Sequence, residues 1–332
     1  MTGNTRRGVV VTGWFPVRLV FCTACLVCLP AGRASGVVID TLTGTGNTTA
    51  PADDPGWANV GVRGAGTGVY LGDGWVLTTA RVGGGSIVLG SGTYAMLAGS
   101  GTTLGNAGAA GRSATTDLYL YQIVSPPTGL PTLTIASAGP IVGDTVTMIG
   151  AGRDRGSFTQ WSVDTQTDPW TWTEVSSGGS AAGYQTLASR AMRWGTNAID
   201  HTGVWLDDGF GDALSFVTSF TASGSPSNEA QAVAGDLGGA VFRKNGSEWE
   251  LSGLMLTALG YSGQPDPLQN AIYGDETFIA DLSFYRPQIV AIVPEPSSMA
   301  ILAPAVAVFA TALGRRLRGR GRTAGRGCRE GA

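Results

Sequence analysis

The stretch that decides the fold class covers residues 66–82 and reads GTGVYLGDGWVLTTARV. Two apolar runs, 68–71 and 75–79, lie on either side of Gly72, Asp73 and Gly74. Short β-branched and aromatic runs around a glycine-rich turn predict two antiparallel strands joined by a tight hairpin. β-Structure is therefore the starting hypothesis for the whole domain.

Similar short runs recur through residues 36–293, where no long stretch has apolar residues at helical spacing. We expect further strands at 86–89, 118–123, 145–150, 158–163, 214–221, 240–242 and 248–256. The connecting segments 99–112, 176–183 and 223–228 are predicted to be loops. The 52 glycines fall between the runs without a fixed period, which excludes collagen-like and solenoid repeats. The sequence thus predicts one all-β domain, a sandwich or a pair of barrels.

The N-terminal segment, residues 1–34, has the order of a secretory signal. Arg6 and Arg7 precede an apolar run at 19–29, and small residues follow at Gly32 and Ala34. This order predicts a signal helix that signal peptidase removes after Ala34. A short buried helix or a retained anchor is the alternative.

The C-terminal segment, residues 293–332, has three parts. Pro294, Glu295 and Pro296 lie in the motif 293–298, and an apolar run at 299–313 follows. The end, 314–332, contains a cluster of basic residues that includes Arg315, Arg316 and Arg318. The order predicts a transmembrane helix at 299–313 whose basic end stays on the cytoplasmic side.

This C-terminal order resembles the PEP-CTERM sorting signal of bacteria that export proteins together with extracellular polysaccharide. The resemblance covers about the last 40 residues and implies an exosortase-type sorting enzyme as a partner. It also implies a protein that is held in the membrane by the C-terminal helix and then delivered to the cell surface or the extracellular matrix. An ordinary membrane anchor with a chance proline pair is the alternative.

Cysteine and charge distribution set further limits on residues 35–292. The chain has four cysteines, all in the two end segments: Cys22, Cys25, Cys28 and Cys328. The domain between them cannot form a disulfide and must be stabilised by burial. Between the two ends the chain carries 22 acidic and 10 basic residues, a net charge near −12. Such a surface repels phosphate backbones, so no nucleic-acid partner is expected. The sequence predicts no cofactor and no metal.

Two later segments, 116–123 (TDLYLYQI) and 234–242 (AGDLGGAVF), have their own motifs. With 66–82 they resemble, in order, the segments that carry the catalytic histidine, aspartate and serine of trypsin-like serine peptidases. The resemblance covers most of residues 60–285. It implies two six-stranded-type antiparallel β-barrels within a domain at 35–292.

The same resemblance predicts that the catalytic triad is degenerate. Arg81 stands where the family has histidine, Asp117 matches the orienting carboxylate, and Leu237 replaces the serine. Arginine stays protonated and cannot act as a base, and leucine has no nucleophilic atom. The backbone of Gly235, Asp236 and Leu237 would keep an oxyanion-type turn, which without a nucleophile can only bind.

Several side chains have a structural and a functional interpretation. We expect the Arg81 guanidinium to pair with Asp117, or alternatively to point freely into solvent. His201, the only histidine, is expected on an exposed loop or strand end, and Asp236 as a structural residue. The acidic segment 207–212 is predicted to be a solvated turn, with a calcium loop as the alternative.

Five tryptophans are expected in the core or in cross-strand pairs, with a carbohydrate-binding surface as the alternative: Trp161, Trp170, Trp172, Trp194 and Trp205. Together these observations favour an exported surface or matrix protein whose inactive trypsin-like domain binds a protein or a polysaccharide. An active trypsin-like serine endopeptidase and a structural matrix component without a ligand are the competing hypotheses.

Overall fold

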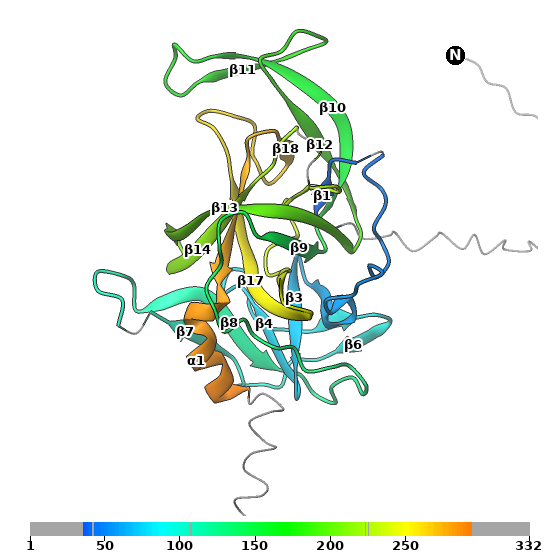
Figure 1. Ribbon diagram of the computed structural model, residues 1–332, viewed down its shortest axis with the longest axis vertical. Coiled ribbons are helices and arrows are strands. Elements are labelled where there is room, and N and C mark those ends of the chain that lie inside the picture. The colour runs from blue at the N-terminus through cyan, green and yellow to red at the C-terminus, as the bar shows by residue number, and fades with distance from the viewer. Residues whose placement is uncertain (1–35, 42, 107, 223, 225, 294–332) are drawn as a thin grey trace, which may run out of the picture. The chain divides into compact units, whose positions relative to one another are not determined.

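The computed structural model describes residues 36–41, 43–106, 108–222, 224 and 226–293 (Figure 1). The predicted signal, the motif residues Pro294, Glu295 and Pro296, the helix at 299–313 and the arginines Arg315, Arg316 and Arg318 lie outside these residues. Within them, no helix has the length and apolarity needed to cross a bilayer. The predictions for the two ends of the chain therefore stay predictions.

A closed antiparallel barrel forms one half of the described domain. Its strand order is β13-β14-β19-β17-β16-β9. The bounds are β9 Thr145–Gly150, β13 Arg193–Asp207, β14 Asp212–Ser219, β16 Ala240–Asn245, β17 Glu248–Leu259 and β19 Glu276–Asp281. One buried cluster draws a side chain from every strand of the barrel: Met148, Ile199, Phe216, Val241, Met255 and Ile279. Because the inward-facing residues alternate along each strand, these side chains fill the barrel interior.

A seven-stranded sheet with the order β6-β5-β2-β3-β4-β8-β7 forms the other half. The bounds are β2 Val60–Arg63, β3 Gly66–Gly72, β4 Trp75–Thr78, β5 Ile87–Leu89, β6 Gly92–Tyr94, β7 Thr102–Gly105 and β8 Thr115–Gln122. The predicted hairpin is β3 and β4. Gly72, Asp73 and Gly74 at its turn all have positive φ, between 48° and 118°, which explains the two glycines.

The expectation of two closed barrels is wrong in detail for this first half. The chain after β6 turns at Leu97, whose carbonyl accepts from Ser100 N at 3.2 Å, before it enters β7. The piece around Met96 lies beside the end of β8 through one bridge to Ile123, where Leu97 N donates to the Gln122 carbonyl and Val124 N to the Ala95 carbonyl, both at 2.8 Å. The turn separates β6 from β7, which lie at the two edges of the sheet. The hydrogen-bond ladder between the two edges is therefore not continuous.

A third, four-stranded sheet was not expected from the sequence and has the order β11-β10-β12-β18. Its strands are β10 Arg153–Asp164, β11 Thr171–Val175, β12 Ala181–Arg190 and β18 Asn270–Ile272. In Figure 1 the β10–β11 hairpin extends at one end of this sheet. A two-stranded sheet pairs β1, Val38–Ile39, with β15, Ala230–Gln231.

Two short helical elements complete the domain: a 3₁₀ turn η1, Trp57–Asn59, and an α-helix α1, Leu282–Ile292. The sequence did not predict α1, which contains Pro287. The carboxylate of Asp281 caps its first turn by accepting from Ser283 N at 3.0 Å. The helix buries Leu282, Tyr285 and Ile289, a helical spacing too short to stand out in the sequence.

Strands also replace parts of two predicted loops. β7 lies within 99–112, and β12 begins inside 176–183. Both contain mostly small or polar residues, and they are strands because neighbouring strands supply their hydrogen-bond partners.

The two halves share one hydrophobic core. A single cluster joins Leu77 and Leu118 of the first sheet with Phe242 and Leu254 of the barrel and with Tyr285 of α1. The two halves therefore bury apolar side chains against each other.

Candidate functional site

The three predicted triad positions come from different elements that meet where the two halves pack. Arg81 follows β4, Asp117 lies on β8, and Leu237 precedes β16. The Arg81 amide donates to Asp117 Oδ1 at 2.9 Å, and Asp117 is fully buried. The Leu237 carbonyl accepts from Thr67 N on β3 at 2.9 Å. Since β3 pairs with β4 and β4 with β8, the fold brings all three positions to one region.

The Arg81 side chain does not pair with Asp117, and it is not free in solvent, so both predictions for it are wrong. Its Nη2 donates to Asp208 Oδ2 at 3.2 Å and to the Asp208 carbonyl at 3.0 Å. The guanidinium also lies 4.9 Å from the centre of the Phe210 ring. Asp117 is already engaged by the backbone amide of Arg81, while the side chain of Asp208, 4 % exposed, offers a second acceptor.

Asp117 and Asp208 form a pair of neighbouring carboxyl groups beneath Arg81. Burial raises the pKa of Asp117 to about 7, against the opposing hydrogen bond from the Arg81 amide. The neighbouring Asp208 carboxyl acts on the pKa of Asp117 in the same direction as burial. Burial therefore favours the protonated form of Asp117 in the acidic to neutral range.

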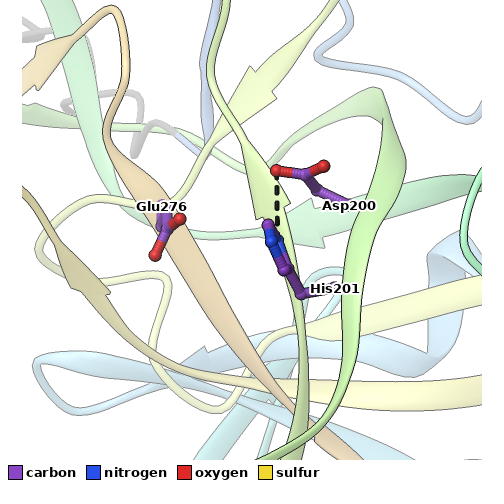
Figure 2. A group of neighbouring side chains, drawn as sticks. All are labelled: Asp200, His201 and Glu276. Atoms are coloured by element: carbon purple, nitrogen blue, oxygen red, sulfur yellow. Dashed lines mark ion pairs between the residues drawn. The ribbon is translucent and has the colours of Figure 1, made fainter.

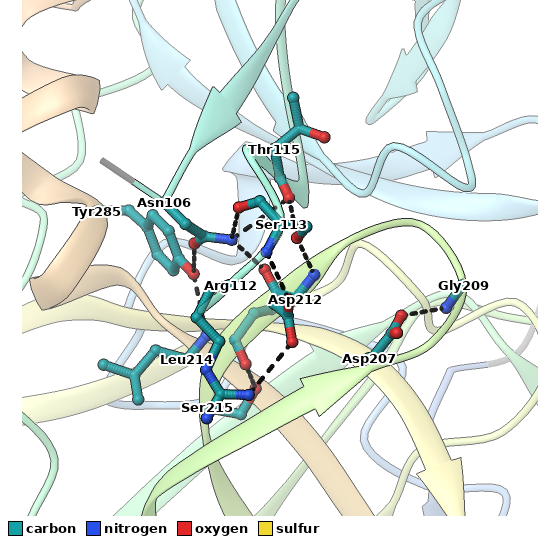
Figure 3. A network of polar contacts seen from close by, with 11 residues as sticks. Asn106, Arg112, Ser113, Thr115, Asp207, Gly209, Asp212, Leu214, Ser215 and Tyr285 are labelled. Carbon is teal, nitrogen blue, oxygen red and sulfur yellow. Dashed lines mark hydrogen bonds and ion pairs between the residues drawn. The ribbon is translucent and has the colours of Figure 1, made fainter. Parts of the chain in front are cut away.

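The acidic segment 207–212 is a turn whose Asp207, Gly209 and Phe210 are exposed, in line with the predicted solvated turn, but the side chains of Asp208 and Asp212 bind residues outside it. Figure 3 shows how Asp212 and Ser113 bind each other reciprocally. Ser113 N donates to Asp212 Oδ2 at 2.7 Å, and Asp212 N donates to Ser113 Oγ at 2.6 Å. Asn106, itself fixed by the Tyr285 hydroxyl at 2.9 Å, donates to the Asp212 carbonyl. This network positions the turn that delivers Asp208 to Arg81.

The turn at Gly235, Asp236 and Leu237 is held by hydrogen bonds from Thr67 to the carbonyls of Gly235 and Leu237. Thr67 Oγ1 donates to the Gly235 carbonyl at 2.8 Å. Gly238 has φ +85°, and a Cβ there would lie 2.2 Å from the Thr67 carbonyl, so the turn requires glycine. Leu237 is 7 % exposed and belongs to the buried core. Hydrocarbon therefore occupies the position where the resemblance implies a nucleophile.

Asp236 lies fully buried behind this turn. Its Oδ1 accepts from Gly152 N at 2.7 Å and its Oδ2 from Val233 N at 2.9 Å. Burial raises the pKa of Asp236 to about 7, although these two amides and the charge of Arg190 act in the opposite direction. The side chain thus connects the end of β9 to the loop before β16.

The predicted tryptophans divide into three groups. Trp161 is a core residue at 1 % exposure. Trp194 and Trp205 are half-buried, with Trp205 packed edge-on against Phe284 at 5.8 Å between ring centres.

Trp170 and Trp172 instead line an open groove of about 480 Å³ beside the β10–β11 hairpin. Tyr261, which the sequence analysis did not single out, stacks on both, with ring centres 6.0 and 6.3 Å away. Ser180 and Thr165 lie at the same groove. Tyr261 is distant from the two tryptophans in sequence, so no local pattern connects it to them.

His201 is exposed, as the sequence predicted, but it lies within β13 and not on a loop or at a strand end. It pairs across the ladder with Val217 and forms an ion pair with its neighbour Asp200. No contact joins it to Arg81 or Asp117 in the described part of the chain.

The sequence matches no known family, and no curated protein sequence is similar to it. Some solved structures are similar to this one in part. A mutant of human heparin binding protein has 14 % identity and a TM-score of 0.46, covering 76 % of this chain and 97 % of that one. A second mutant of the same protein has 15 % identity and a TM-score of 0.44 with the same coverage. Mouse neuropsin, a serine protease, has 14 % identity and a TM-score of 0.44, covering 75 % of this chain and 99 % of that one.

Proposed function

We propose that the domain is a catalytically inactive trypsin-like module, carried by an exported protein, whose role is binding. The observation that carries this proposal is the Arg81 guanidinium, tied to Asp208 where a triad needs an imidazole. A general base has to accept a proton near neutral pH, and a guanidinium cannot. Leu237, which is buried, supplies no attacking atom.

Asp117 supports the same interpretation. In the triad template a buried carboxylate orients the base and stabilises its charged form. Here Asp117 Oδ1 accepts from the backbone amide of Arg81, and Asp208 is the neighbouring carboxyl group. Asp117 therefore has no imidazole to orient, and its remaining role is structural.

The destination proposed from the sequence completes this function. Residues 1–34 would direct export through signal peptidase, and 293–332 would be recognised by an exosortase-type enzyme. The protein would be held by its C-terminal helix and then reside on the cell surface or in the extracellular matrix. Replacing Pro294, Glu295 and Pro296 by alanine and fractionating the cells tests this proposal. Retention of full-length protein in the membrane is expected, and an unchanged distribution would contradict it.

The groove at Trp170, Trp172 and Tyr261 is where we propose that the module contacts a polysaccharide. Aromatic faces attract the polarised C–H bonds of a sugar ring, and hydroxyls such as Ser180 Oγ suit its polar edge. The residues that line the groove carry no charge, which favours a neutral sugar chain over an acidic one.

The peptidase test uses the purified full-length chain in detergent, with a labelled general protein substrate and a serine-directed fluorophosphonate. No turnover and no labelling are expected. The double variant Arg81→His with Leu237→Ser is compared with each single variant, since activity restricted to the double variant would show a retired triad. Turnover by the unmodified chain, or a labelled serine, would support the active endopeptidase and overturn the proposal.

The binding test measures retardation of the full-length chain in gels that contain soluble dextran, xylan or mixed-linkage β-glucan. One of them should retard the unmodified chain. Trp170→Ala should lose most of this retardation, and Trp194→Ala, a half-buried tryptophan elsewhere, should keep it. Equal mobility in all gels would favour the structural matrix component without a ligand.

A further inference from the structure

Asp200, His201 and Glu276 form a cluster on the outer face of the barrel (Figure 2). One donor atom from each side chain lies within 4.8 Å of the others. Asp200 and His201 are exposed and Glu276 is half-buried. No local pattern predicts a metal site here, because Glu276 lies far from the other two residues along the chain.

A β-bulge in β13 brings two consecutive side chains to the same face. Ile199 pairs with Thr218 and His201 with Val217, so Asp200 is an extra residue in the ladder. Successive strand residues normally point to opposite faces, and a bulge re-aims one of them. Accordingly, Ile199 is buried at 1 % exposure while Asp200 and His201 are both exposed.

Glu276 reaches the same place through the next strands of the barrel. It begins β19 and pairs with Ser219 at the end of β14, and β14 in turn pairs with β13. Because the barrel is closed and its strands are hydrogen-bonded on both sides, the three backbones are held rigidly. Only the side chains need to move to accommodate a ligand.

The separations fit a small cation. His201 Nδ1 and Asp200 Oδ2 are 3.2 Å apart. Two donors at about 2.0–2.2 Å from one tetrahedral Zn²⁺ lie about 3.3 Å from each other, so this pair already has the required spacing. The Ser219 hydroxyl donates to Asp200 Oδ2 at 2.7 Å, the kind of outer contact that fixes a ligating carboxylate. Glu276 needs only a side-chain rotation to complete the set.

The charge of the cluster also favours a cation. Among the described residues, neither Asp200 nor Glu276 has an ion pair with lysine or arginine. The residues between the two ends of the chain carry a net charge near −12, which adds to the negative potential. One imidazole and two carboxylates are suitable ligands for first-row divalent cations.

We propose that Asp200, His201 and Glu276 bind a divalent first-row cation of the Zn²⁺ type. Three protein donors leave one tetrahedral position for water or for a donor from another molecule. The competing possibility is that the imidazole, when protonated, is itself the cation between the two carboxylates. The proposal is independent of the proposed binding and sorting functions.

The test is calorimetric titration of the full-length chain with ZnCl₂. The four cysteines are first alkylated, because thiolates would bind zinc themselves. We expect one Zn²⁺ per chain for the unmodified protein. His201→Gln and Glu276→Gln should each weaken binding by about tenfold or more. Glu248→Gln, the same change at an exposed position on another strand, should stay within about twofold.

A second readout uses the unmodified chain, which has a single histidine. The imidazole proton resonances of His201 should shift or broaden on addition of Zn²⁺ and return with a chelator. Absence of binding, or equal binding by His201→Gln, would overturn the proposal. Binding that leaves the His201 resonances unchanged would also overturn it, since the metal would then lie elsewhere.

Discussion

The two ends of the β13–β14 hairpin carry similar side chains in opposite environments. At the tip, Asp208 lies buried against Arg81 and Asp117. Near the other end, Asp200 and His201 are exposed beside Glu276. At the tip, burial raises the pKa of Asp117 and Asp208 binds the Arg81 guanidinium, whereas at the other end Asp200 is exposed and Glu276 is half-buried. The same residue type therefore has a structural role where it is buried, as at Asp208, and can bind a cation where it is exposed, as at Asp200.

The largest effect is expected from breaking the buried tip. Asp208→Ala removes both the partner of Arg81 and the neighbour of Asp117. We expect a loss of about 2 kcal/mol in the free energy of unfolding, less than for a fully buried pair because Arg81 is partly exposed. Denaturant unfolding of the full-length chain measures it.

The matched control for that variant is Asp207→Ala. Asp207 is the exposed neighbour and accepts only from Gly209 N at 2.9 Å. Its loss should cost less than about 1 kcal/mol. Equal effects at positions 207 and 208 would mean that the Arg81–Asp208 contact contributes little.

The raised pKa of Asp117 at the tip predicts a dependence of stability on pH. The folded pKa of Asp117, about 7, lies above its ordinary value of 3.8, so the folded state binds a proton that the unfolded state releases between these values. This contribution is present at low pH and is lost as pH rises toward 7. Asp117→Asn, whose amide can donate to Asp208 at any pH, should reduce the loss of stability between pH 5 and pH 8 by about 1 kcal/mol or more.

Unfolding of the unmodified chain and of Asp117→Asn at both pH values checks this prediction. Asp236 and Asp275 also have pKa values that burial raises to about 7, so the variant should keep part of the slope. An unchanged slope in Asp117→Asn would show that Asp117 is ionised throughout.

The smallest effect is expected at the exposed end. His201→Gln, in the presence of a chelator, should change the free energy of unfolding by no more than about 0.5 kcal/mol, because the side chain is 60 % exposed. A loss comparable to that of Asp208→Ala would show that the imidazole is a structural element of the barrel. The same unfolding assay makes the comparison direct.

Local patterns predicted most of the strands that are apolar in themselves. β4, β9 and β17 have runs of apolar residues, and the sequence placed all three close to their observed bounds. β13, with Arg193, Asn197 and Asp207 among its residues, has no such run. It is a strand because β9 and β14 supply hydrogen-bond partners to its backbone on both sides. A local sequence pattern does not contain that information.

The contacts of the candidate site were not predicted from the sequence. The motifs located Arg81, Asp117 and Leu237, and the fold brings these segments together. The role of Asp208 was missed because the composition of 207–212 is typical of a solvated turn. Only the structure shows that Ser113 and Asn106 bind Asp212 and so hold this turn in place. The acidic cluster itself was visible, but nothing in it indicated burial.

The sequence by itself determined that the domain is all-β, that it has no cysteine, and that Arg81 and Leu237 lack the chemistry of a base and a nucleophile. These properties belong to residue types and to short-range alternation. Only the tertiary structure decided that Arg81 binds Asp208, that the first half is a sheet with a single closing bridge, and that Glu276 lies beside His201. Each of these depends on which distant strands pair, and pairing is fixed by burial of a shared core that no local window contains.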